Sequence, residues 1–180
     1  KLGVTGYFKD IADLVNHKRY INNETGNIFW INNNSDYARV KGFEITLTQR
    51  PWRNFSGGLT YTYQNAMGKA SDKTQAFLDN YYQRLPRTED FPLDWDQRHT
   101  ARAGVNYRIP PSNNVIMGDW GLDVAFRIGS GAPYSSATNV TPPNLPPIND
   151  KRMPTSWQID LRIDKGVKVY ENITVDAFLE

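Results

Sequence analysis

The feature that most constrains this chain is an alternation of apolar and polar side chains with a period of two residues. Residues 157–164 put Trp157, Ile159, Leu161 and Ile163 on one face, against Gln158, Asp160, Arg162 and Asp164. Successive side chains of a β-strand point to opposite faces of a sheet, so this pattern predicts a strand with one apolar face. The same alternation runs through residues 55–65, 101–109 and 120–129.

Extending this pattern along the chain predicts about seven strands. They lie near residues 2–9, 38–49, 55–65, 98–109, 119–129, 156–165 and 172–180. Most are close to the roughly 9–11 residues that a tilted strand needs to cross a bilayer. Outer-membrane barrels have short periplasmic turns and longer extracellular loops, so the three long connections, 10–37, 66–97 and 130–155, are predicted extracellular loops. Residues 10–15 could form one helical turn, and residues 28–31 a hairpin extension.

Composition narrows the class of protein. The chain has 180 residues, is 39% hydrophobic and contains no cysteine. It has no run of about 18 apolar residues, so no transmembrane helix is predicted. Without cysteine, disulfides and thiolate zinc sites are excluded. A net charge of +2 gives no sign of a basic nucleic-acid-binding face.

These observations favour an all-β fold, namely an antiparallel segment of a transmembrane β-barrel. A soluble β-sandwich could show the same polar residues to solvent, and the two interpretations differ in whether the apolar face meets lipid. Both chain ends read as internal to a longer sequence, with an odd number of strands to follow. We expect that the segment does not fold alone, because unpaired strand edges cannot face lipid.

The polar face of the predicted strands carries many charges. A lattice of ion pairs on a wetted inner wall is the simplest interpretation, and contact with a substrate or a plug is the alternative. The predicted lumen-facing residues are Glu44, Arg102, Arg108, Asp123, Arg127, Asp160, Arg162, Asp164 and Asp176.

Aromatic residues near the strand ends suggest two interfacial belts, as membrane barrels show. Trp52, Tyr107 and Trp120 fall near short turns, and Tyr37, Trp95 and Trp157 near long loops. Ordinary packing of edge aromatics is the alternative.

A site for a metal or for catalysis is weakly indicated. Asp94, Asp96 and His99 could in principle hold a metal, but a hydrogen-bonded loop closure is the favoured interpretation. No pairing of a nucleophile with a base is specified, so we predict no enzyme activity and no cofactor.

Several segments resemble the C-terminal part of the barrel of TonB-dependent outer-membrane receptors. They include Thr5-Gly6-Tyr7-Phe8-Lys9-Asp10-Ile11, Ala38-Arg39-Val40-Lys41-Gly42-Phe43-Glu44, Leu59-Thr60-Tyr61-Thr62-Tyr63, Asp96-Gln97-Arg98-His99-Thr100, Gly129-Ser130-Gly131-Ala132-Pro133-Tyr134 and Ile159-Asp160-Leu161-Arg162. The resemblance implies a barrel of about 22 strands around a plug. It also implies location in a Gram-negative outer membrane and energy from the TonB complex through an absent N-terminal part.

The first functional expectation is therefore part of a receptor and transporter for active ligand uptake. Ligand contacts are expected from aromatic loop residues, chosen for their expected exposure: Trp30, Tyr37, Tyr81, Tyr82, Trp95 and Tyr134. The alternative is a scaffolding barrel that anchors surface lipoproteins or other envelope proteins without transport. An outer-membrane protease or lipase is a third, weaker interpretation.

Overall fold

The computed structural model describes residues 1–70, 77–78, 81–82, 89–112, 116–136, 147–170 and 173–180. Its strands are β1 (Leu2–Ile21), β2 (Ile28–Trp52), β3 (Phe55–Gly68), β4 (Phe91–Pro92), β5 (His99–Ile109), β6 (Trp120–Gly129), β7 (Pro133–Tyr134), β8 (Lys151–Arg152), β9 (Ser156–Tyr170) and β10 (Ile173–Leu179). None of the described residues belongs to a helix with the length and apolar character needed to cross a membrane.

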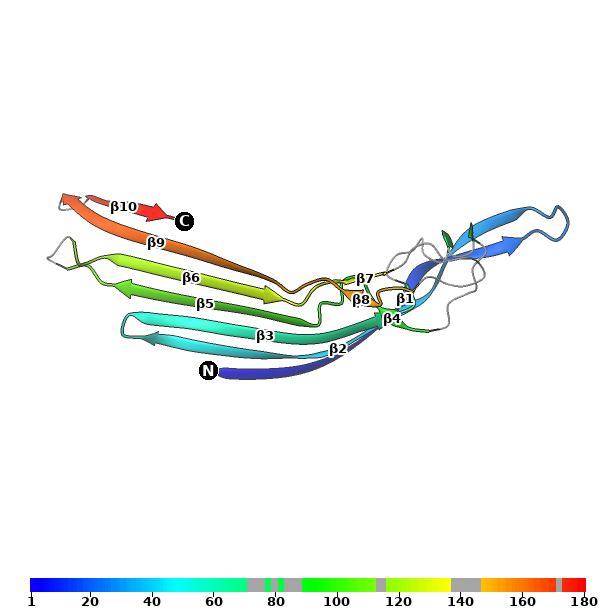
Figure 1. The fold of residues 1–180 in the computed structure, drawn as a ribbon, viewed down its shortest axis with the longest axis horizontal. Coiled ribbons are helices and arrows are strands. Elements are labelled where there is room, and N and C mark those ends of the chain that lie inside the picture. Colours follow the sequence, from blue (N-terminus) through cyan, green and yellow to red (C-terminus); the bar gives the residue numbers. More distant parts are fainter. Residues whose placement is uncertain (71–76, 79–80, 83–88, 113–115, 137–146, 171–172) are drawn as a thin grey trace.

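The long strands form one antiparallel sheet in the order β1-β2-β3-β5-β6-β9-β10, with β4 added to the end of β3. A separate pair, β7 with β8, lies beside one end of it. Figure 1 shows a long, curved sheet whose short turns gather at one end. We call this the turn end, and the opposite end, near β4, β7 and β8, the loop end. Long strands that follow one another in the sequence pair with each other, as in barrel hairpins.

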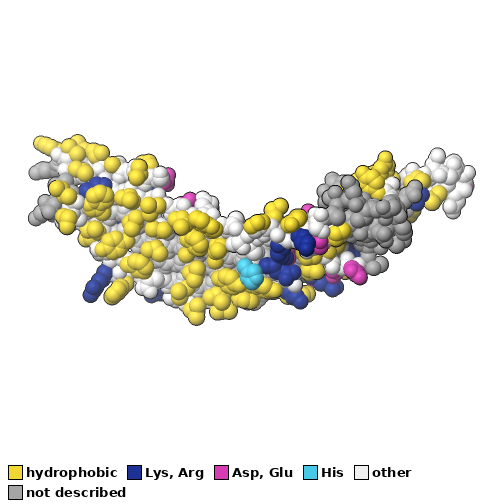
Figure 2. Space-filling view, viewed as in Figure 1, with side chains coloured by type: hydrophobic (Ala, Val, Ile, Leu, Met, Phe, Trp, Pro, Cys, Tyr) yellow, Lys and Arg dark blue, Asp and Glu magenta, His cyan; other side chains and the backbone are white. Residues whose placement is uncertain are grey.

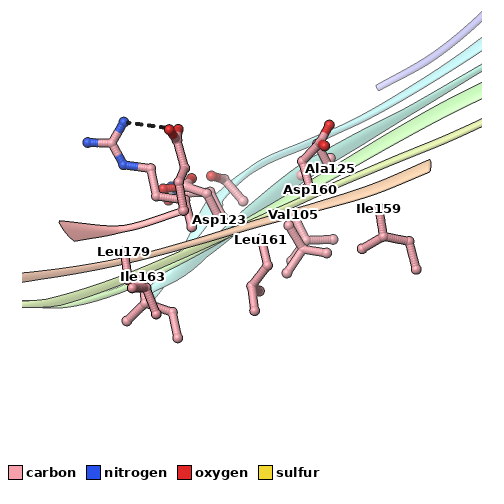
Figure 3. Close-up of a pocket in the computed structure, with 15 residues that line it drawn as sticks. Val105, Asp123, Ala125, Ile159, Asp160, Leu161, Ile163 and Leu179 are labelled. Atoms are coloured by element: carbon pink, nitrogen blue, oxygen red, sulfur yellow. Dashed lines mark hydrogen bonds and ion pairs between the residues drawn. The ribbon is translucent and has the colours of Figure 1, made fainter.

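The strand register sorts the side chains into two faces. One row runs Leu2, Leu47, Leu59, Ala103, Phe126 and Ile159 across six strands. We call this side the apolar face, and the opposite side the polar face. Leu2 is 67% exposed and Ile159 56%, and Figure 2 shows hydrophobic side chains spread over the sheet. In Figure 3 Ile159, Leu161 and Ile163 lie on one side of the ribbon, and Asp123 and Asp160 on the other.

The fold class predicted from the sequence is therefore confirmed: an antiparallel sheet typical of a β-barrel segment. The sheet is not closed within the described residues, since β1 pairs only with β2 and β10 only with β9. A continuous exposed apolar face of this extent marks a surface that is covered by something other than water.

The largest correction concerns residues 10–37, which the alternation pattern placed in a loop. Strands β1 and β2 instead continue through most of this segment and pair as far as Ile21 with Ile28. The predicted helical turn at 10–15 is also wrong, because this segment is extended and Asp13 has a φ of 61°. Register shifts between Ile11 and Val15 mark a bulge. We call residues 14–36 the β1–β2 extension, and it projects beyond the sheet in Figure 1.

Smaller differences appear in the other two predicted loops. Strand β3 runs on to Gly68, and Phe91 and Pro92 pair with its end as β4. Pro133 and Tyr134 pair with Arg152 and Lys151, which folds the ends of the 130–155 connection together. Residues 71–76, 79–80, 83–88 and 137–146 of these predicted loops lie outside the described residues.

A small buried core sits at the loop end. Ala38, Val40, Ala66 and Leu93 are buried together, with Tyr7 and Leu14 packed against them. Leu93 reaches the core because its backbone N–H donates to the Ala66 carbonyl, 3.1 Å away. The segment that follows β4 is therefore folded onto the polar face of β2 and β3.

Candidate ligand-binding site at the loop end

The β1–β2 extension is closed by turn-forming residues that a period-two alternation does not indicate. Its tip is closed by Asn22, whose side-chain oxygen accepts from the backbone N–H of Glu24 at 2.8 Å and of Thr25 at 3.2 Å. Gly26 follows with a φ of 69°, a left-handed conformation that glycine adopts without strain. An Asx turn and a glycine thus hold the two strands in register.

An aromatic cluster covers one side of this extension. Phe77 is at its centre: its ring centroid lies 4.8 Å from Trp30, 6.3 Å from His17 and 6.1 Å from Tyr81. Tyr81 in turn contacts Tyr82 at 5.3 Å. Trp30, Tyr81 and Tyr82, three of the predicted ligand-contacting residues, are therefore brought together. We call His17, Trp30, Phe77, Tyr81 and Tyr82 the aromatic cluster.

The cluster is open to solvent on its far side. Tyr81 is 67% exposed and Tyr82 50%, while Trp30 and Phe77 are half-buried. Large exposed rings bind ligands with little loss of side-chain entropy. Phe77 was missed by the sequence analysis. The sequence around Phe77 has no period-two alternation, so it did not indicate which side chain would pack against β1 and β2.

Tyr37 has a structural role in this arrangement. Its hydroxyl donates to the Asp90 carboxylate at 2.5 Å, and this hydrogen bond raises the pKa of Tyr37. The guanidinium of Arg39 and the ammonium of Lys69 lie 5.0 and 5.6 Å from the centre of its ring. The hydroxyl of Tyr37 is hydrogen-bonded and two cations lie over its ring, so Tyr37 supports the loop end more than it presents a free ring.

A buried carboxylate joins two of the long connections. Asp96 is fully buried and accepts from the Ala66 N–H at 2.8 Å and from Arg98 Nε at 3.0 Å. Arg152 also donates to the Asp96 carboxylate, and its Nη1 donates to the Asp96 carbonyl at 2.6 Å. We call this the Asp96 tie. The favoured interpretation of residues 94–99 as a hydrogen-bonded closure agrees with this geometry.

A buried amide, that of Asn149, strengthens the same junction. Asn149 donates through Nδ2 to the Pro92 carbonyl and to Asp94, both at 2.7 Å. Beside it, Asp150 accepts from the backbone N–H of Ser136 at 2.8 Å and from its hydroxyl, which lowers the pKa of Asp150. Segments 92–98 and 147–152 thus form one hydrogen-bonded body.

The three residues considered as metal ligands face different partners. Asp96 is engaged by arginines, Asp94 by Asn149, and His99 Nδ1 lies 2.8 Å from the Tyr61 hydroxyl on the apolar face. Within the part of the chain that the structure describes, no group of three potential metal ligands is found.

Trp95 and Tyr134 complete the predicted ligand contacts. They are 48% and 42% exposed. No ring contact joins either of them to the aromatic cluster among the described residues. They flank the Asp96 tie instead, so the six predicted residues divide into a cluster of three, a supporting tyrosine and two separate exposed rings.

The aromatic residues of the apolar face gather near both ends of the strands. At the turn end, Trp52 and Trp120 carry cations 5.0 and 5.2 Å from their ring centres, from Arg53 and Lys165. Towards the loop end, Phe43 packs against Tyr61 and Tyr63, with Trp157 exposed nearby in the strand register. Rings with polar edges at two levels suit two water–lipid interfaces.

On the polar face, the predicted lumen-facing residues all share one side of the sheet according to the register: Glu44, Arg102, Arg108, Asp123, Arg127, Asp160, Arg162, Asp164 and Asp176. That this side lines a barrel interior stays a prediction.

Ion pairs connect part of this face. Arg108 on β5 and Asp164 on β9 meet through two contacts of 3.1 and 3.3 Å, although β6 lies between them. They meet because the intervening residue is Gly121, where a β-carbon would overlap the Asp164 carboxylate. Asn106 donates to Asp123, and Arg162 lies 4.0 Å from Glu180. The lattice is densest at the turn end.

A family-wide sequence profile described as "TonB dependent receptor-like, beta-barrel" matches residues 1–179. No curated protein and no solved structure matches the chain. The profile spans nearly the whole chain, and the open antiparallel sheet with one apolar face is the structure such a barrel wall requires. The chain belongs to the TonB-dependent receptor-like β-barrel family.

Proposed function

We propose that this chain forms part of the barrel wall of an outer-membrane receptor that takes up a ligand actively, and that the aromatic cluster contacts this ligand. The family supplies the class of protein. The observation that carries the proposal is the convergence of Trp30, Phe77 and Tyr81 on an extension that projects beyond the sheet.

The two faces of the sheet support an outer-membrane location. An apolar face with aromatic residues at both ends of the strands is suited to lipid, and the polar face to a wetted interior. Under this proposal the turn end lies in the periplasm and the loop end outside a Gram-negative cell. The TonB complex would then act on a part of the protein other than this chain, since the described strands are scaffold.

Topology can be tested by labelling, because the chain has no cysteine of its own. Thr25→Cys places a thiol at the tip of the extension, and Asn54→Cys places one in the turn between β2 and β3. In intact cells a membrane-impermeant maleimide should label the first and should label the second only after the outer membrane is opened. Equal labelling of both positions would contradict the proposed orientation.

Uptake is tested with the full-length protein in its native host. Metal chelates, cobalamin, oligosaccharides and peptides are screened for accumulation that an uncoupler abolishes. Trp30→Ala and Tyr81→Ala should then weaken binding of the accumulated compound, each by roughly tenfold, which is the effect of losing a buried aromatic contact. Tyr170→Ala, an exposed ring at the turn end, is the matched control. Uptake that is indifferent to the uncoupler, or equal losses in all three variants, would refute the proposal.

A scaffolding role is the second candidate, and one observation favours it. On the extension, Tyr20 stacks on Phe29 at 5.8 Å, and Phe29 and Ile31 are each 44% exposed. This surface could bind a surface lipoprotein. Removal of Tyr20 and Phe29 would then release a co-purifying lipoprotein without changing uptake, whereas a receptor without such a partner would purify unchanged.

A further inference from the structure

Two arginines face each other directly across neighbouring strands of the polar face. Arg102 on β5 pairs in register with Arg127 on β6. Both side chains are exposed on the same side of the sheet. Like charges placed directly opposite each other on a sheet destabilise it. Nothing in the register requires this pairing, since a neutral residue at either position would remove the repulsion.

The other arginines on this face show how the repulsion is normally avoided. Arg108 is held by Asp164, with a weaker contact to Asp123, and Arg162 lies beside Glu180. Among the residues that the structure describes, no carboxylate lies within 4.0 Å of Arg102 or Arg127. Asp160 is one pair away along β9, but it accepts from Gln158 at 2.7 Å instead.

The surroundings of the pair are concave and rich in hydrogen-bonding groups. A hollow of about 230 Å³ lies here, and its polar lining includes Gln97, Thr100, Arg102, Arg127, Ser156 and Gln158. Gln97 closes one side: its amide lies over Gly129, where a β-carbon would overlap it, and it donates to the Ser130 carbonyl at 2.9 Å. With about 30 Å³ for each water molecule, the hollow has room for a small oxyanion.

We propose that Arg102 and Arg127 form an anion-binding site for a soluble oxyanion, either a carboxylate or a phosphate group. Two guanidinium groups from residues that line one hollow can bind such a group through parallel N–H···O bonds. The bound charge would also remove the repulsion between the arginines. The site is separate from the aromatic cluster. Only its position along the path of a transported ligand rests on the proposed function.

The test uses the natural full-length protein in non-ionic detergent at low ionic strength, with inorganic phosphate as the probe. Calorimetric titration should show binding by the wild type. Exchange of both arginines (Arg102→Gln with Arg127→Gln) should weaken it by at least roughly tenfold, as expected for the loss of charge-assisted hydrogen bonds. Arg162→Gln is the matched control, because it removes one positive charge from the same face outside the hollow. Its binding should stay within about twofold of the wild type.

A second variant separates charge from geometry. Arg102→Lys with Arg127→Lys keeps both charges but loses the guanidinium groups, so its affinity for phosphate should lie between those of the wild type and the glutamine variant. This variant also keeps the test decisive if the glutamine variant fails to fold.

Three results would overturn the proposal. One is an equal loss in the Arg162→Gln control, which would show a general effect of charge. Another is wild-type affinity in the lysine variant. The third is no phosphate binding by the wild type. If the glutamine variant then also had a lower melting temperature than the wild type, the arginines would be binding a carboxylate of the same polypeptide. None of these measurements depends on uptake, so their failure is distinguishable from failure of the proposed transport function.

Discussion

The regular sheet and the β1–β2 extension use the same secondary structure but are stabilised differently. In the sheet, each interior strand pairs on both edges, and its two faces differ sharply in polarity. In the extension, two strands pair only with each other, and polar residues face each other, as in the pair Asn16 with Asn33. An isolated hairpin is at best marginally stable in water. The extension therefore depends on side-chain contacts from outside it, above all on Phe77.

The two regions tolerate different changes. The sheet can lose one side chain on its exposed faces at little cost, whereas it is sensitive to its backbone spacing. The loop end is sensitive to the loss of single side chains, because a few buried polar groups and rings hold segments that lack a continuous ladder of backbone hydrogen bonds. Substitutions in the two regions test this difference.

The largest effect is expected from Asp96→Ala. It leaves two arginines without their buried partner and the Ala66 N–H without an acceptor, at a cost of about 3 kcal/mol. Hydrogen exchange on the full-length protein should show lost protection in 92–98 and 147–152, with the sheet unchanged. Asp10→Ala breaks an ion pair of 3.6 Å whose two side chains are both 55% exposed, and it should change little. Similar losses in both variants would mean that burial does not set the strength of the tie.

Gly42→Ala tests the backbone spacing of the sheet. A β-carbon at Gly42 would overlap the Tyr63 carbonyl oxygen and lie 2.7 Å from the Tyr7 hydroxyl. Overpacking of this kind costs about 2 kcal/mol, which urea unfolding of the reconstituted protein can measure. Gly104→Ala is the control, because nothing lies within 4 Å of its β-carbon position. If the two variants unfold alike, the sheet is more deformable than this comparison assumes.

Phe77→Ala should loosen the extension without affecting the sheet. It removes the ring that contacts His17, Trp30 and Tyr81, and each aromatic pair contributes about 1 kcal/mol. Limited proteolysis should then cut within 14–36 faster. Phe29→Ala removes only the stacked contact with Tyr20 and should have the smaller effect. Faster cleavage in the Phe29 variant than in the Phe77 variant would mean that the contact between Tyr20 and Phe29 supports the extension more than Phe77 does.

The smallest predicted effect is a dependence on pH at the base of the extension. Burial raises the pKa of Asp36, although its hydrogen bond from Asn16 at 2.9 Å acts in the opposite direction. A raised folded-state pKa contributes stability that is complete below the ordinary value of 3.8 and is lost as the pH rises through the folded value. Protection of the extension should therefore fall as the pH rises from 3.8, and Asp36→Asn should abolish this change. A dependence of opposite sign would contradict it.

Sequence reasoning performed best where the chain is most regular. Seven alternating stretches were predicted, and each overlaps one of the long strands of the sheet. The reason is physical: a sheet with one apolar face must repeat every two residues. The long connections follow no such repeat. The bulge at Asp13 breaks the alternation, and asparagines on the extension remove the polarity difference that marks a strand.

The candidate site was predicted in part. Exposed aromatic residues can be selected from loops, and three of six came together. The contacts of Phe77 with His17 and Trp30, and of Tyr37 with Asp90, depend on how segments 40 to 60 residues apart in the sequence meet. The opposed arginines were named one by one, but only the register between β5 and β6 reveals that they face each other.

The Asp96 tie has a consequence for the evolution and engineering of this surface. Its carboxylate comes from one connection and its second guanidinium, Arg152, from another. Grafting the Asp96 segment alone onto a related barrel would remove one of the two guanidinium groups that bind its buried carboxylate, and grafting the other segment alone would leave Arg152 without this partner. The two segments should therefore be inherited, exchanged and transplanted together, as a single module.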